Sequence, residues 1–95
     1  ATKLAMSSDN KYFIEMYVLE NEDATKDLYN EKKQGFEERK QVGDTAKETS
    51  KKNLETYTLK SNGDCMYVKR IENVIISYTV KDTDEQKASE FVKSL

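Results

Sequence analysis

The chain holds a single cysteine, Cys65, in the stretch KSNGDCMY that runs from Lys60 to Tyr67. A cysteine acts as a nucleophile in its thiolate form, and the ammonium group of Lys60 or Lys69 would lower the pKa of the thiol. Such a nucleophile also needs a general base, and the 95 residues include no histidine to act as one. We therefore expect Cys65 to be an ordinary strand residue in a protein that is not an enzyme. The alternative is a cysteine-dependent enzyme that uses Cys65 with Lys60 or Lys69.

Carboxylates are numerous, but their spacing is not that of a metal site. Asp82, Asp84 and Glu85 come together before the last predicted helix, without the ordered oxygen ligands and the glycine of a calcium loop. The helix dipole explains this cluster, because it favours negative charge at a helix N-terminus. The three glycines are isolated, so the chain has neither a P-loop nor a dinucleotide-binding GxGxxG. We expect no metal ion and no cofactor.

Basic and acidic residues are mixed along the chain, with 16 Lys and Arg against 18 Asp and Glu and a net charge of −2. A nucleic-acid-binding domain normally gathers a basic excess on one face, so we expect no nucleic-acid partner. No apolar run approaches the roughly 18 residues that cross a bilayer. The length fits one domain over residues 1–95, soluble as given, with membrane contact only through an anchor outside this chain.

Apolar periodicity predicts one α+β domain with the element order β-α-β-β-β-α. Residues 1–11 are expected to be an irregular N-terminal segment, and the polar stretch 43–53 a flexible loop. Asn21 is expected to cap the first helix, and Thr83 the second. We predict a four-stranded, mainly antiparallel sheet with both helices packed on one face. The predicted strands cover residues 12–20, 54–60, 65–71 and 74–80, and the predicted helices cover about 21–40 and from 83 to the end of the chain.

The dipeptide Asn62-Gly63 sets the register of the central hairpin, because a two-residue turn of this kind needs positive φ at both positions. The turn pairs Lys60 with Cys65 and, on the other face, Leu59 with Met66. Cys65 then lies on the more polar face and is expected to be at least partly exposed.

The next hairpin has two alternatives. A two-residue turn over 72–73 places Tyr78 on the same face as Cys65, so that the two hairpins disagree about which face is apolar. A three-residue loop over 71–73 pairs Met66 with Tyr78 instead and gives the sheet a single apolar face. We prefer the three-residue loop.

Strand tyrosines are the candidates for a contact surface, since aromatic side chains are enriched in interfaces. Tyr17, Tyr67 and Tyr12 occupy strand positions, and Lys69 follows Tyr67 on the same face. The alternative is that the tyrosines fill half-buried strand positions. We take Tyr17, Tyr67 and Lys69 as the candidate interaction surface.

Two stretches resemble a class of known proteins, namely YFIEMYVLENEDATKDLYNEKKQGFE and NLETYTLKSNGDCMYVKRIENVIISYTV with the short helix that follows. Over roughly residues 12–95 the chain resembles small extracytoplasmic lipoprotein domains of Gram-positive bacteria, whose function is unknown. The specific parts are a strand before an acidic helix start with Ala24, and the R-x-x-N from Arg70 to Asn73. The lipid-attachment cysteine of such proteins is missing here, which fits a chain cut downstream of the anchor. The resemblance implies a place outside the cytoplasm and no known catalysis.

The function we expect is that of a non-enzymatic extracytoplasmic binding or interaction domain for a protein or small ligand. A homodimer formed through the strand 12–20 is a further alternative, because an apolar strand with an unpaired edge invites pairing. The sequence starts at Ala1 and stops at Leu95 within an apolar helical pattern. We therefore expect the native polypeptide to extend beyond both ends.

Overall fold

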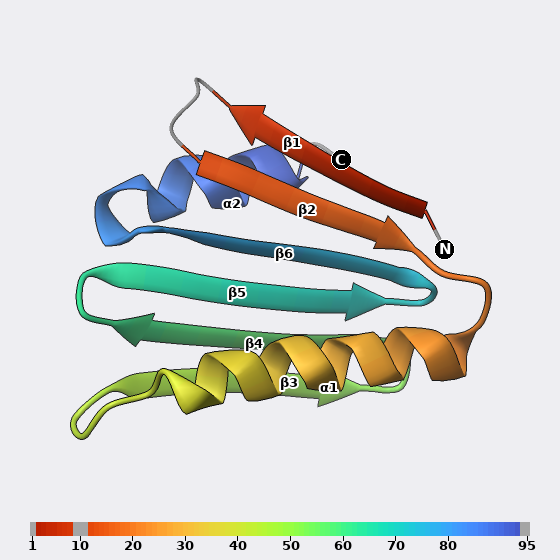
Figure 1. Ribbon diagram of the computed structural model, residues 1–95, viewed down its shortest axis with the longest axis horizontal. Helices are drawn as coiled ribbons and strands as arrows, with labels where there is room; N and C mark the ends of the chain where they lie inside the picture. The colour runs from red at the N-terminus through yellow and green to blue at the C-terminus, as the bar shows by residue number, and fades with distance from the viewer. Residues whose placement is uncertain (1, 9–11, 94–95) are drawn as a thin grey trace.

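The computed structural model describes residues 2–8 and 12–93, which form a single α+β domain around one antiparallel sheet (Figure 1). The sheet has six strands in the order β1-β2-β6-β5-β4-β3, so the predicted count of four is wrong. Two helices and one 3₁₀ turn, η1, complete the fold. The elements are β1 (Thr2–Ser8), β2 (Tyr12–Val18), α1 (Glu22–Glu38), β3 (Thr45–Lys51), β4 (Leu54–Ser61), β5 (Asp64–Ile71), β6 (Val74–Lys81), η1 (Asp82–Asp84) and α2 (Glu85–Lys93).

The two additional strands form the edges of the sheet, in segments predicted to be irregular. β1 lies within the expected irregular segment 1–11, of which residues 1 and 9–11 fall outside the described residues. β3 lies within the expected flexible loop 43–53 and pairs with β4 over its whole length. Only Ala46 of β3 is half-buried, because an edge strand needs little apolar surface, and the apolar alternation that marks a strand is therefore missing. β2 pairs with both β1 and β6, so it lacks the unpaired edge assumed for a homodimer.

The central hairpin is confirmed. Asn62 and Gly63 have φ values of 57° and 83°, as the turn requires, and Lys60 pairs with Cys65 and Leu59 with Met66.

The preferred register of the next hairpin is wrong. Ile71 pairs with Val74 across a two-residue turn, in which Glu72 has a φ of 52°. Tyr78 therefore lies on the same face as Cys65. The preference for a three-residue loop assumed a single apolar face, whereas this sheet buries side chains on both faces.

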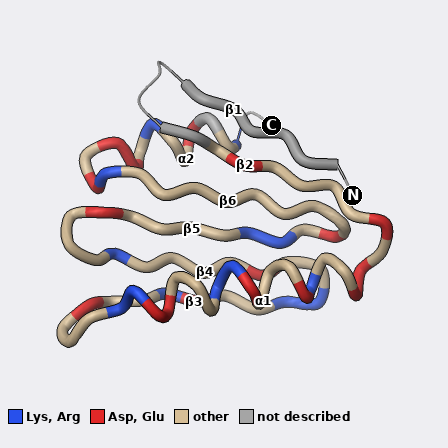
Figure 2. The backbone as a smooth tube through the Cα atoms, viewed as in Figure 1, with Lys and Arg blue, Asp and Glu red and all other residues tan. Residues whose placement is uncertain are grey.

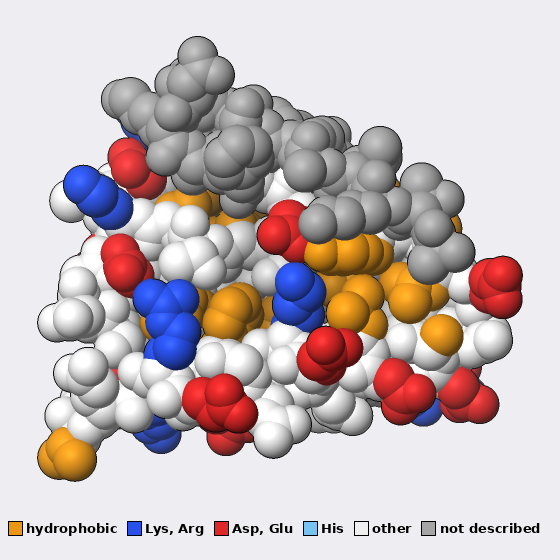
Figure 3. All heavy atoms as spheres, in the orientation of Figure 1, with side chains coloured by type: hydrophobic (Ala, Val, Ile, Leu, Met, Phe, Trp, Pro, Cys, Tyr) orange, Lys and Arg blue, Asp and Glu red, His pale blue; other side chains and the backbone are white. Residues whose placement is uncertain are grey.

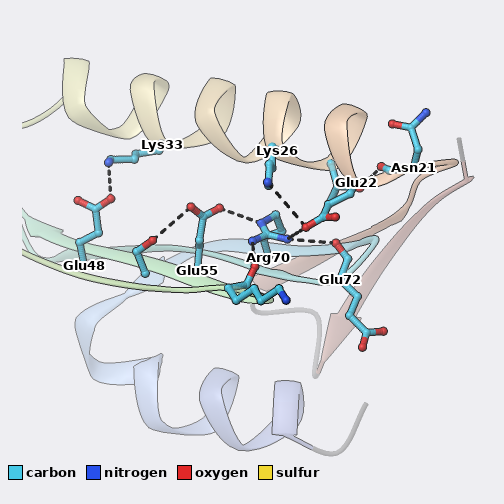
Figure 4. Close-up of polar contacts among 11 residues, drawn as sticks. Asn21, Glu22, Lys26, Lys33, Glu48, Glu55, Arg70 and Glu72 are labelled. Carbon is cyan, nitrogen blue, oxygen red and sulfur yellow. Dashed lines mark hydrogen bonds and ion pairs between the residues drawn. The ribbon is translucent and has the colours of Figure 1, made fainter.

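The two helices cover opposite faces of the sheet, so the prediction that they share one face is also wrong (Figure 4). α1 crosses β4, β5 and β6, and α2 lies mainly against β6. Each helix closes its own apolar cluster. The α1-side core contains Tyr29, Tyr57, Leu59, Met66, Val68 and Ile75, and the α2-side core contains Ile14, Cys65, Ile76, Tyr78, Val80, Ala88 and Val92.

The start of α1 follows the prediction, whereas the start of α2 does not. Oδ1 of Asn21 accepts a 2.8 Å hydrogen bond from the backbone N–H of Ala24, which is the expected cap. Thr83 lies inside η1 instead of capping α2, and α2 begins at Glu85. Within residues 2–8 and 12–93, neither helix is long and apolar enough to cross a membrane.

Candidate binding surface

Cys65 is fully buried, so the expected exposure of its thiol is wrong. Its side chain is 0% exposed and belongs to the α2-side core, together with Val80 and Ala88. Burial raises the pKa of Cys65 to about 11, and the charge of Glu85 adds to the rise, whereas Lys60 acts in the opposite direction. At neutral pH the sulfur is therefore an enclosed thiol, without the thiolate character of a nucleophile.

Lys60 lies across the hairpin from Cys65, but its ammonium group is paired with the start of α2. Its Nζ is 3.1 Å from Oε2 of Glu85 and 3.5 Å from Oδ1 of Asp82. The hydrogen bond that Lys60 donates to Glu85 is the main cause that raises the pKa of the lysine. The positive charge that could have lowered the thiol pKa is thus compensated by two carboxylates.

The candidate contact residues Tyr17 and Tyr67 lie on opposite faces of the sheet and form no common surface. Tyr17 packs against the α1-side core, with the ammonium of Lys32 5.3 Å from its ring centroid. Tyr67 packs against the α2-side core and stacks on Tyr78 at 4.9 Å between ring centroids. Both side chains are half-buried, in agreement with the alternative that they fill strand positions, and the side chain of Tyr12 lies outside the described residues. Lys69 shares its face with Tyr67.

A large part of the α2 side of the sheet carries no helix. Among the described residues, α2 lies mainly against β6, so neither helix covers the same face of β3 and β4, or of the second half of β5. Pairing of β3 with β4 and of β4 with β5 fixes which side chains lie there. We call this surface the open face; it comprises Thr45, Lys47, Thr49 and Lys51 of β3, Leu54, Thr56, Thr58 and Lys60 of β4, and Tyr67, Lys69 and Ile71 of β5.

The strand residues of the open face include four lysines and four threonines but no carboxylate. In the part of the chain that the structure describes, Lys47, Lys51 and Lys69 form no ion pair with an acidic side chain. Each of the four lysines occupies a different row of paired residues, and successive rows lie about 7 Å apart along the strands. Lys47, Lys69 and Lys51 therefore form a stepped line of positive charge on a chain whose net charge is −2, whereas Lys60, at one end of the open face, is paired with Asp82 and Glu85.

The acidic strand residues point to the other face. Glu48 accepts a hydrogen bond from Lys33 of α1, and Glu55 accepts one from Arg70. β5 contains one stretch of basic residues, coloured blue in Figure 2. It holds Lys69 and Arg70, which are adjacent in the strand, so their side chains lie on opposite faces of the sheet. On the α1 side, side chains of both signs are intermixed (Figure 3). The charges are thus separated between the two faces, which their order along the sequence does not reveal.

A depression of about 220 Å³ lies at one end of the open face. Two threonines, two lysines and one glutamate line it: Thr45, Thr58, Lys47, Lys60 and Glu85. Hydroxyl and ammonium groups can both donate hydrogen bonds to an anionic group. A second hollow of about 290 Å³, at the end of α1, is lined by residues of both signs, with Arg39 3.9 Å from Asp64. The lining of the first hollow has two lysines against one carboxylate, and Lys47 keeps its charge for an anion although Lys60 is paired with Glu85, whereas the second hollow has two basic side chains against two carboxylates.

Arg70 is the buried charged residue among those that the structure describes, and its hydrogen bonds are made within the domain (Figure 4). The side chain is 1% exposed, and Nε donates to Oε2 of Glu55 at 2.8 Å. The guanidinium also donates to the carbonyl oxygens of Lys52 at 3.3 Å and Glu72 at 3.4 Å. Glu22 of α1 lies 3.8 Å away. This arrangement ties two hairpin turns to the start of α1 and serves the fold.

No group of three or more His, Cys, Asp and Glu side chains suited to a metal ion occurs in residues 2–8 and 12–93. Comparison with protein-family models, with curated proteins and with solved structures finds no match for this chain. The resemblance to extracytoplasmic lipoprotein domains therefore stays a prediction.

Sequence reasoning found Tyr67 and Lys69 on the open face but missed Lys47 and Lys51. Both lie in the segment 43–53, whose polar composition predicts a flexible loop. A signal was present, because Thr45, Lys47, Thr49 and Lys51 repeat at every second position. A repeat of two residues is typical of a strand, and here the alternate positions hold threonine and lysine instead of apolar residues.

Proposed function

We propose that this protein is a non-enzymatic binding domain that holds an anionic ligand on the open face. The observation that carries the proposal is the separation of charge, with lysines and no carboxylate on the strand residues of this surface. Complementary charge guides a ligand to such a surface and fixes its position there. The extracytoplasmic location belongs to this proposal and is supported by the sequence resemblance alone.

The threonines and lysines of the open face suit this role better than Tyr17 and Tyr67. Lys47 and Lys51 are exposed, and their long side chains can reach anionic groups above the sheet. Hydroxyl groups of Thr56 and Thr58 lie between the lysines and can donate further hydrogen bonds. Tyr67 is occupied by its stacking on Tyr78, so it supports the sheet beneath the ligand.

The test is an NMR titration of backbone amides with three polyanions: polyglutamate, polyphosphate and a sulfated polysaccharide. We expect amide shifts that map to β3, β4 and β5, and affinity that falls steeply with salt. The variant with Lys47→Glu and Lys69→Glu should bind at least about tenfold more weakly, because both lysines face the ligand.

The matched control carries Lys26→Glu and Lys40→Glu, which make the same change in net charge away from the open face. Both residues are exposed, and Lys26 forms only an exposed ion pair with Glu22. We expect the control to keep its affinity within about twofold. Equal losses in the two variants, or no shift in β3–β5 with any of the polyanions, would overturn the proposal.

A further inference from the structure

β3 offers one unpaired edge directly beside the open face. Within the described part of the chain it is the last strand of the sheet and pairs with β4 alone, so the backbone N–H and C=O of every second residue of Thr45–Lys51 point outward. All of its residues except Ala46 are exposed. A strand edge of this kind can receive a further extended segment through main-chain hydrogen bonds.

The charges of β3 differ between its two faces. Lys47 and Lys51 point to the open face, whereas Glu48 points to the α1 side and accepts a hydrogen bond from Lys33. Side chains directly opposite each other on neighbouring strands lie about 5 Å apart. A segment added at this edge would therefore place every second side chain next to the lysines, and carboxylates at those positions would complement them.

The shape of this side of the sheet favours a chain-like ligand over a membrane surface. α2 packs on the sheet on the same side as the open face, and the helix projects from that side, as the edge-on view shows (Figure 4). The open face thus lies lower than the outer surface of α2 beside it. A flat bilayer in contact with α2 would be about 10 Å from the open face, which is the spacing of packed layers.

The aromatic content of the open face disfavours single-stranded nucleic acid. Proteins that bind single strands stack bases on exposed aromatic rings. Tyr67 is the aromatic residue among the side chains assigned to the open face, and its ring is half-buried and stacked on Tyr78. Recognition here relies on ammonium groups, hydroxyl groups and a backbone edge, and a peptide is the ligand that uses all three.

We propose that the ligand of the open face is an extended acidic peptide segment, which pairs with β3 as an additional strand and places alternate carboxylates beside Lys47 and Lys51. This inference rests on the proposed function and names the class of ligand. Since the two lysines are four residues apart, acidic side chains at matching alternate positions would face both of them at once.

The experiment uses blocked peptides of about nine residues, long enough to cover β3. The first alternates glutamate and threonine; a second has the same composition with the glutamates in adjacent pairs, so that half of them face the wrong side. We expect the paired sequence to bind at least about threefold more weakly, because only alternate residues share a face. Binding of the first peptide should protect outward-pointing β3 amides from hydrogen exchange.

Two N-methylated forms of the alternating peptide test the strand pairing itself. In one form the methyl groups are on the odd residues and in the other on the even residues. Only one of the two sets of N–H groups faces β3 in an added antiparallel strand, so one form should lose at least about tenfold in affinity and the other should keep it. These probes need no change to the protein, so loss of folding cannot imitate the result.

The outcomes separate this inference from the proposed function. If polyphosphate or single-stranded nucleic acid shifts β3–β5 amides while N-methylation leaves peptide binding unchanged, the acidic strand is wrong and anion binding on the open face stands. The same conclusion follows if anionic vesicles bind and the alternating peptide does not. If neither the peptide nor any polyanion shifts these amides, the proposed anion binding and the inferred acidic peptide ligand are both wrong.

Discussion

The thiol of Cys65 is surrounded by the apolar side chains of the α2-side core, and this environment determines its chemistry. Removal from water disfavours the charged form, so the pKa rises from 9.0 to about 11. The charge of Lys60 opposes this rise, but Glu85 and Asp82 pair with that lysine. A thiol that lies across a hairpin from a lysine is therefore not activated by it when carboxylates pair with that lysine.

We predict that Cys65 in the folded domain reacts with an aromatic disulfide reagent at least about 100-fold more slowly than in urea, since two pKa units reduce the thiolate fraction by that factor. The measurement is the rate of thiol release at about pH 8, where an ordinary cysteine reacts readily. Equal rates with and without urea would contradict the buried position.

The same pKa shift links stability to pH. Because the folded-state pKa lies above that of an exposed thiol, the stabilisation is complete below about pH 9 and is lost as the pH rises through about 11. Cys65→Ala lacks this titration, so the gap in free energy of unfolding between the wild type and the variant should narrow over that interval. A gap that stays constant across the interval would contradict this prediction.

At the scale of elements, the Arg70 guanidinium connects parts of the fold that are distant in sequence. It donates to Glu55 of β4 and to carbonyl oxygens at the turns after β3 and β5, and it lies close to Glu22 at the start of α1. Removing one partner of a buried ion pair leaves the other without its counter-charge. The cluster therefore fixes the end of the sheet against α1.

We predict that Arg70→Met lowers the free energy of unfolding by about 3–5 kcal/mol, because Glu55 loses its partner. The double variant with Glu55→Leu should be more stable than Arg70→Met alone, and urea unfolding of the two single variants and the double variant measures this coupling. Arg39→Met is the control, since its ion pair with Asp64 is exposed and should contribute less than about 1 kcal/mol. Strict additivity in the cycle would show that the two residues do not interact.

The strands with apolar sequences could be predicted, whereas the edges and the second hairpin could not. Asn62-Gly63 specifies a turn by its backbone preference alone, so the β4–β5 register follows from local chemistry. The Glu72-Asn73 turn has no such preference, and its register depends on α2 covering a second face of the sheet. The packing of α2 on the second face is a tertiary contact that local sequence does not specify. Because this contact was not predicted, Cys65 was expected to be exposed.

The candidate site was found only in part, for a related reason. Lys69 could be placed because β5 was recognised as a strand, but Lys47 and Lys51 could not, since β3 has almost no buried residue. Apolar patterning reveals which strands form the core and is silent about strands whose side chains all face water. The open face consists largely of such side chains.

For the whole molecule, the sheet is buried on both faces, but its strands are protected from local opening to different degrees. β5 and β6 have a paired strand on either side, and both contribute to the α1-side and α2-side cores. β3 has one partner and one half-buried residue. Opening of the backbone should therefore be most costly at the centre of the sheet and least costly at β3.

We predict that backbone amides of β5 and β6 exchange with solvent most slowly, and that those of β3 exchange fastest among the strands from β2 to β6. Native-state hydrogen exchange followed by NMR measures this order. Slower exchange in β3 than in β5 for the unliganded domain would contradict the assigned strand order.

The lysines of the edge strand also have an effect on contact between identical molecules. If two copies joined through β3 in one continuous sheet, a two-fold axis perpendicular to the sheet would bring Lys47 and Lys51 of both copies onto one surface. Like charges on neighbouring strands repel each other. The same lysines that would attract an acidic peptide to β3 therefore disfavour the pairing of β3 with β3 of a second copy. We expect this repulsion to keep the molecules apart at low salt and to weaken at high salt, where the charges are screened.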